Sequence, residues 1–178
     1  DAGPTVPAGD EVPDTAHCAP VAAWDAEWIA FEDEVLRLVN ENRAKGWNCG
    51  IQGQFGPTTA LTTNKNLRCA ARLHSRDMND RQFFDHNAPG GVTPKARMDA
   101  AGYVGTTWGE NIAKGQTSPA KVVQDWMESD GHCANIMNPA FKEIGVGYYA
   151  GAQNGQFFNP NLYWTQNFGA PCTQAWCM

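Results

Sequence analysis

The order of the periodic segments along the chain limits its possible folds more than any other feature. Two segments alternate apolar and polar residues as half-buried strands do, residues 143–150 and 162–169, and both lie near the C-terminal end. Earlier segments repeat apolar residues three and four apart, as helices do, at residues 24–45, 64–81, 94–101 and 119–128. Because helices and strands are segregated, the sequence predicts an α+β domain of about four helices around a small antiparallel sheet.

The ends of the predicted helices carry recognisable boundary residues. Thr93-Pro94 and Ser118-Pro119 each place a capping hydroxyl before a proline suited to the first helical turn. Gly46 and Gly102 are natural helix ends. Three further segments are predicted to be a helical turn, "HCANIMNP" (132–139), and two loops, "HNAPGGVTP" (86–94) and "WGENIAKGQ" (108–116).

Length and charge restrict the domain count and the partners. The chain has 178 residues and a formal net charge of −6, and this length fits one domain with one core. Residues 1–20 are rich in Pro, Gly and Asp and are predicted to form an extended arm, with residues 21–178 forming a single domain.

The acidic balance argues against nucleic acid and anionic membrane surfaces as partners, since both favour basic patches. No apolar run approaches the roughly 20 residues of a transmembrane segment.

Six cysteines are scattered along the chain without a CxxC pair. In an acidic domain of this size, such scatter favours disulfides formed in an oxidising compartment over a zinc cluster. We therefore expect a secreted or extracytoplasmic protein, although the sequence does not fix the pairing. The open alternatives are Cys133 with Cys49 or Cys69, and Cys172 with Cys177 or Cys18.

Three histidines and one carboxylate are candidates for a functional site. His74 lies on the apolar stripe of a predicted helix, which is typical of a hydrogen-bonded core residue. His86 and His132 follow predicted helices, where an imidazole could bind metal or transfer a proton near neutral pH, or only cap a helix C-terminus. Glu110 lies in a predicted loop between a glycine and an asparagine, where a carboxylate is usually solvated.

The signatures of several common enzyme classes are missing from the sequence. G-x-S-x-G, H-E-x-x-H, Walker A and G-x-G-x-x-G do not occur, so serine hydrolases, zincins and nucleotide-binding enzymes lose their usual support. Ser118 and Lys121 match the S-x-x-K of penicillin-recognising enzymes, but no K-T-G follows and Ser118 is explained as a helix cap. A dyad of Cys133 and His132 is conceivable, although a disulfide at Cys133 would consume its thiol.

Seven segments form one ordered series within about residues 24 to 170. They are "VNENRAKG" (39–46), "LRCAARLHSRDM" (67–78), "FFDHNAPGG" (83–91), "WGENIAKG" (108–115), "VVQDWMESDGHCANIMNP" (122–139), "EIGVGYY" (143–149) and "YWTQNFG" (163–169). Together they resemble the CAP superfamily of cysteine-rich secretory, antigen 5 and pathogenesis-related 1 proteins, most closely its bacterial secreted members. The resemblance implies a three-layer α-β-α sandwich. It also implies a cleft where two histidines and two acids converge, a tetrad that holds a divalent metal such as zinc in some members.

The resemblance carries over to individual positions unevenly. His86 matches the first histidine of the tetrad, and Glu110 matches the Gly-Glu-Asn acid. Eukaryotic members place the second histidine where this chain has Tyr163, whereas bacterial members have a Gly-His after the fourth helix, here His132. The second acid would be Glu128, which stands two residues after a tryptophan rather than three. The implied metal ligands are His86 and His132, with zinc the expected ion.

Three functions are compatible with these residues. The first is a secreted binding module that takes a small apolar ligand, a glycan or a partner protein, which the seven tryptophans and the "NGQFFNPN" connection would suit. The second is a metal-dependent, peptidase-like hydrolase in which His86 and His132 bind metal and Glu110 is a base or orients a histidine. Glu110 and His86 are thus the candidate catalytic residues. The third is an extracellular structural domain with a vestigial cleft.

Overall fold

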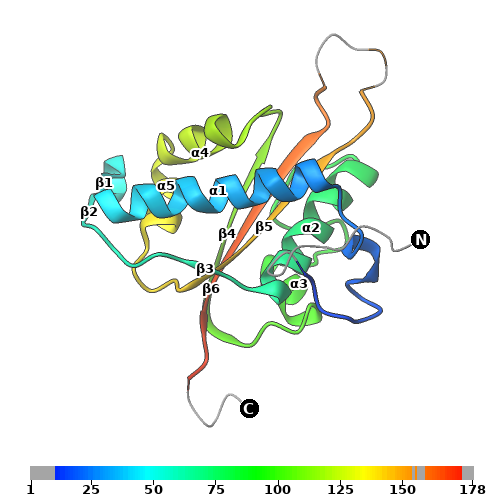
Figure 1. The fold of residues 1–178 in the computed structure, drawn as a ribbon, viewed down its shortest axis with the longest axis horizontal. Helices are drawn as coiled ribbons and strands as arrows, with labels where there is room; N and C mark the ends of the chain where they lie inside the picture. The colour runs from blue at the N-terminus through cyan, green and yellow to red at the C-terminus, as the bar shows by residue number, and fades with distance from the viewer. Residues whose placement is uncertain (1–10, 154, 156–158, 174–178) are drawn as a thin grey trace.

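The computed structural model describes residues 11–153, 155 and 159–173 (Figure 1). Its helices are α1 (Ala26–Lys45), α2 (Lys65–Asp80), α3 (Pro94–Ala100), α4 (Pro119–Met127) and α5 (Asp130–Met137), with short 3-10 helices η1 (Ala19–Val21) and η2 (Gly50–Gln52). Its strands are β1 (Trp47–Asn48), β2 (Gln54–Phe55), β3 (Thr62–Thr63), β4 (Gly105–Lys114), β5 (Glu143–Ala150) and β6 (Leu162–Pro171).

The central sheet has four strands in the order β3-β5-β6-β4. β6 pairs antiparallel with both neighbours, and Glu110 of β4 lies opposite Asn167 of β6. β3 is parallel to β5 over two residue pairs, so the sheet is mixed rather than wholly antiparallel as predicted. β1 and β2 form a separate two-stranded hairpin. This order leaves β4 at one edge of the central sheet.

Two layers of helices enclose this sheet. α1, α4 and α5 share one buried apolar cluster with the sheet, represented by Val35, Trp126 and Ile136. On the other side, α2 packs against β5 and β6 and shares a second cluster with α3. Figure 1 shows α1 crossing in front of the strands of the sheet, with α2 and α3 to the right of these strands in this view. The predicted three-layer α-β-α sandwich is therefore confirmed.

Two glycines allow α2 to lie directly on β5. A Cβ atom added at Gly145 would come within 2.1 Å of the backbone of Leu67 and Arg68. One added at Gly147 would come within 2.3 Å of the backbone of Ala71. Side chains alternate across a strand, so these glycines free one face for the helix while Ile144 and Val146 fill the core on the other.

The helix predictions are confirmed, and their capping residues explain why. Asn64, Thr93 and Ser118 each accept hydrogen bonds from backbone N–H groups of the first helical turn. Two predictions are wrong. The stretch from Trp108 belongs to β4 rather than a loop, and residues 130–137 form a full helix, α5, rather than a single turn.

Disulfides settle part of the cysteine pairing. Cys18 bonds to Cys69 and Cys49 bonds to Cys133, so Cys18 is not the partner of Cys172 and Cys133 has no free thiol for a dyad. Cys172 is also disulfide-bonded, whereas Cys177 lies outside the described residues.

The described part of the predicted arm is not extended. Residues 14–23 form turns and η1, because the disulfide to α2 buries Cys18 against the second cluster. Phe157 and Phe158 of the "NGQFFNPN" connection lie outside the described residues. Within the part that is described, no helix is both long and apolar enough to span a bilayer.

Candidate functional site

A cleft opens at the β4 edge of the sheet. We call it the edge cleft; its volume is about 370 Å³ and it is lined by His86, Asn87, Pro94, Trp108, Gly109, Glu110 and Asn135. The lining comes from the loop before α3, from the first residue of α3, from β4 and from α5. Segments on both sides of the sheet therefore meet at its free edge and build one site.

Glu110 is buried in this site rather than solvated, with 1% of its side chain exposed. One carboxylate oxygen, Oε1, accepts from Nδ1 of His86 at 2.8 Å. The other, Oε2, accepts from Nη2 of Arg97 at 2.7 Å. The amide of Asn167, oriented by its hydrogen-bonding partners, donates to Oε2 at 2.9 Å. These three donors compensate the loss of water around the carboxylate.

Local structure holds His86 and Arg97, two of the partners of Glu110, in place. The 86–93 loop closes on itself through a β-bridge between Ala88 and Val92. Thr93 then caps α3, which directs Arg97 back beneath the loop. Arg97 donates from Nη1 to the carbonyl oxygens of His86 (2.8 Å) and Val92 (3.1 Å). A single guanidinium therefore fixes both the loop that carries His86 and the carboxylate that faces it.

The two histidines nearest Glu110 have opposite pKa shifts. The hydrogen bond to Glu110 raises the pKa of His86, whose side chain is 48% exposed. His74 is fully buried, and burial lowers its pKa to about 4. Neutral His74 donates from Nε2 to the Asp85 carbonyl oxygen at 3.0 Å. His86 is thus the ring that can exchange protons with solvent, and His74 is a structural residue.

His132 lies on α5, which packs on the face of the sheet opposite to α2. Its Nδ1 forms a 2.9 Å hydrogen bond with the Ser129 hydroxyl. Burial lowers its pKa, and the positive charge of His86 lowers it further. His132 does not line the edge cleft, but its backbone carbonyl accepts from Asn111, the residue after Glu110.

The structure does not bring Tyr163 or Glu128 to the Glu110 carboxylate. Tyr163 is fully buried in a small cluster with Met78 and Ile112, and its hydroxyl has no partner among the described residues. Glu128 caps α4 and lines a different groove, between α1 and α4. Its neighbour Ser129 stands three residues after Trp126, and this serine contacts His132.

The donor set fits a divalent ion only partly. His86 and His132 each have Nδ1 engaged with an oxygen, which leaves Nε2 as the available nitrogen. The Glu110 oxygens are occupied by His86, Arg97 and Asn167. Across residues 11–153, 155 and 159–173, no three His, Cys, Asp or Glu side chains form a group that could hold a metal. Protein zinc sites commonly use three or four such ligands, so two histidines would bind zinc weakly.

Comparison with known proteins identifies the family. The sequence profile of the cysteine-rich secretory protein family, CAP, matches residues 36–168. The chain belongs to the CAP family. The Bacillus subtilis (strain 168) protein YkwD is 38% identical over 162 residues, which is 91% of this chain and 54% of YkwD. The chain thus spans about half the length of this curated relative.

Solved CAP-domain structures share the fold. An extracellular protein containing an SCP domain from Bacillus anthracis superimposes with a TM-score of 0.65 at 26% identity, covering 79% of this chain and 40% of that one. An outer surface protein from Borrelia burgdorferi superimposes with a TM-score of 0.59 at 17% identity, covering 78% of this chain and 94% of that one. At that identity the second likeness supports the fold alone.

Sequence reasoning missed two side chains that shape this CAP site. Arg97 was assigned to a short helix without a role; its place beside apolar Met98 and Ala101 was the available sign that it is buried. Asn135 donates to the Glu110 carbonyl oxygen at 3.3 Å and to Asn111 at 2.9 Å. Asn135 falls within the "VVQDWMESDGHCANIMNP" segment of the family resemblance, but no role was predicted for it, because its partners lie on a strand that had not been predicted.

Proposed function

We propose that this chain is an extracytoplasmic binding domain whose edge cleft takes a glycan. The observation that carries the proposal is the exposed indole of Trp108, which lies in the same cleft as two asparagines and His86. Trp108 is 43% exposed, so part of its indole is accessible to a ligand in the cleft. A flat aromatic face beside hydrogen-bonding amides suits the apolar face and the hydroxyl groups of a sugar ring.

The polar lining has hydrogen-bonding capacity left for such a ligand. Among the described residues, no hydrogen bond engages the side-chain amide of Asn87, and His86 uses only Nδ1. Pockets of this size bind ligands through a few fixed polar groups within a mostly preformed wall. Here Glu110 and Arg97 fix the orientation of His86, so the wall is ordered before a ligand arrives.

The disulfides support the extracytoplasmic location. Cys18–Cys69 and Cys49–Cys133 bridge distant parts of the chain, and such bonds persist in oxidising compartments. One similar protein, from Bacillus anthracis, is described as extracellular.

Binding to a glycan array, followed by calorimetry with the best oligosaccharide, tests the proposal. Trp108→Ala should weaken binding at least about tenfold, the loss expected when one good aromatic contact is removed. Trp47→Ala is the matched control, because Trp47 is 38% exposed but lies outside the cleft. Absence of binding across the array, or equal losses in the two variants, would contradict the proposal.

A hydrolase is the second candidate, and the His86–Glu110 pair is the observation in its favour. A carboxylate on Nδ1 orients an imidazole and raises its basicity, leaving Nε2 to transfer protons. Zn²⁺ would be held by His86 and His132 and would act as a Lewis acid. The engagement of Glu110 by Arg97 makes Glu110 an orienting group rather than a free base.

Activity on a panel of peptides and esters, with and without added Zn²⁺, decides this alternative. Cleavage lost in both His86→Ala and Glu110→Gln would establish the hydrolase. If the purified chain cleaves nothing under either condition, the hydrolase reading fails and the binding proposal is unaffected.

A further inference from the structure

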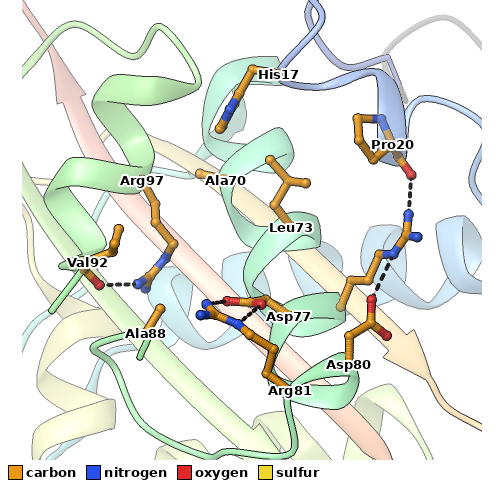
Figure 2. Close-up of a pocket in the computed structure, with 11 residues that line it drawn as sticks. His17, Pro20, Ala70, Leu73, Asp77, Asp80, Arg81, Ala88, Val92 and Arg97 are labelled. Carbon is orange, nitrogen blue, oxygen red and sulfur yellow. Dashed lines mark hydrogen bonds and ion pairs between the residues drawn. The ribbon is translucent and has the colours of Figure 1, made fainter. Parts of the chain in front are cut away.

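A second cavity lies on the outer side of α2, and the 86–93 loop and Arg97 stand between it and the edge cleft. We call it the outer pocket; it has a volume of about 380 Å³ and is shown in Figure 2. His17 and Pro20 line it from the N-terminal segment, α2 contributes its solvent-facing side, and Ala88, Val92 and Arg97 close the far wall. Its volume lies within the range of small-molecule sites in proteins.

The walls of this pocket are tied to α2, so the pocket is preformed. The Cys18–Cys69 disulfide joins the N-terminal segment to α2, and Arg76 donates to the Pro20 carbonyl oxygen at 2.8 Å. On the other side Arg81 pairs with Asp77 and donates to the Pro89 carbonyl oxygen at 3.3 Å. A preformed site avoids part of the ordering cost of binding.

The base of the pocket is apolar. Ala70 and Ala88 are almost fully buried, Leu73 is partly buried, and Val92 is 44% exposed on the far wall. These side chains offer contact to the hydrocarbon part of a ligand but no hydrogen bonds.

Among the described residues, the arginines that line the pocket have more N–H donors than they use. Each aspartate oxygen already accepts a hydrogen bond: Asp77 from Arg81, and Asp80 from Arg76 and Asn79. Each of the three lining arginines carries five N–H donors. Arg97, whose side chain is nine-tenths buried, has an Nε without a partner in the described part of the chain. A ligand that complements this lining supplies acceptors.

We propose that the outer pocket binds a small aromatic carboxylate. The carboxylate would accept from the arginines, and the ring would lie on the apolar base against guanidinium planes, which stack well on aromatic faces. The chain already contains one such stack, with the Arg81 guanidinium 5.5 Å from the ring centre of Phe83. This site is separate from the edge cleft, so it does not depend on the function proposed for that cleft.

Ligand-detected NMR with phenylacetate, and with phenylacetamide as the neutral analogue, tests the proposal on the intact chain. Phenylacetate should bind with a dissociation constant on the order of 1 mM, typical of a ligand with about ten heavy atoms. Phenylacetamide should bind about tenfold more weakly, because a charged acceptor strengthens hydrogen bonds to arginine.

Two variants place the binding in the pocket. Leu73→Trp and Val92→Trp fill it from opposite walls and should each abolish phenylacetate binding. Ala120→Trp is the matched control, because it fills the groove between α1 and α4 instead, and His86→Ala keeps the outer pocket intact while altering the edge cleft. Both controls should bind phenylacetate as the unaltered chain does.

Four results would overturn the proposal, and the first three concern the ligands and the filling variants. They are no saturable binding up to about ten times the expected dissociation constant, equal binding of acid and amide, and unchanged binding in whichever filling variant remains folded by circular dichroism. Loss of binding in His86→Ala would place the ligand in the edge cleft and would also overturn it.

Discussion

Two buried carboxylates, Glu32 and Glu110, each face an arginine, yet their surroundings differ in one respect. Glu32 accepts from Arg72, from the Trp24 indole and from the backbone N–H of Tyr148, and both members of its ion pair are fully buried. Glu110 accepts from Arg97 and from His86, which is about half exposed. A fully enclosed pair joins layers of the fold, whereas a pair that reaches a half-exposed ring can respond to pH and to ligands.

The largest expected effect is the loss of folding stability when Glu32, the fully enclosed carboxylate, loses its charge. Glu32→Gln should lower the free energy of unfolding by about 3–5 kcal/mol, because it removes the negative charge that compensates the buried Arg72 guanidinium. The pKa of His86 should not change. Urea denaturation and NMR titration measure the two quantities, with Glu27→Gln on the same helix as an exposed control. A loss below about 1 kcal/mol would mean that the enclosed pair does not have this structural role.

Acid should act on the Glu110 region through His74, which lies 3.9 Å from the Glu110 carboxylate. Burial holds the pKa of His74 at about 4, whereas an unfolded histidine titrates near 6.5. Between these values the unfolded chain binds more protons, so this contribution to stability falls as pH drops from about 6.5 to 4, by on the order of 3 kcal/mol.

Urea denaturation across that pH range measures the slope for the unaltered chain and for His74→Gln, which removes the titrating ring. The variant should have the shallower profile between pH 6.5 and 4. Identical slopes would show that His74 does not control acid stability.

A smaller effect is expected at Glu110 itself. Glu110→Gln should cost about 2 kcal/mol, less than at Glu32, because Arg97 keeps two carbonyl acceptors. It should also lower the pKa of His86, which the hydrogen bond to Glu110 raises. A raised folded-state pKa stabilises the protein below the unfolded value near 6.5 and loses that contribution as pH rises through the folded value.

The cost of Glu110→Gln should therefore be greater at pH 5.5 than at pH 9. The NMR shifts of the His86 ring report its pKa directly. Asp99→Asn on α3 is the control, because Asp99 is an exposed acidic residue. An unchanged pKa of His86 in Glu110→Gln would contradict the link between the two residues.

The helices could be predicted from signals within a few residues, whereas β4 was missed because it depends on contacts with residues far away along the chain. Asn64, Thr93 and Ser118 cap helices through neighbours within three residues, so the sequence alone was sufficient. β4 was missed because glycine, glutamate and asparagine disfavour strands in isolation. In the fold, Glu110 meets Arg97 and Asn111 meets the carbonyl of His132, so tertiary contacts override that preference.

The same reasoning applies to the candidate site. The order of the motifs identified His86 and Glu110, and in the structure His86 Nδ1 lies 2.8 Å from Glu110 Oε1. Arg97 could not be assigned a role because its partners lie 11 and 13 residues away along the chain. Glu128 was chosen for its charge, whereas the neutral Ser129 beside it is the residue that contacts His132.

The side chains at the two borders of the sheet also have a consequence for self-association. An uncovered strand edge offers free backbone groups with which another chain can pair, and this is a route to aggregation. Asn135 donates to the Glu110 carbonyl oxygen on edge strand β4, and Glu32 accepts from the Tyr148 N–H in the part of β5 that lies beyond its two residue pairs with β3. The residues that surround the cleft and anchor α1 therefore also leave fewer free backbone groups on these two strands with which another chain could pair.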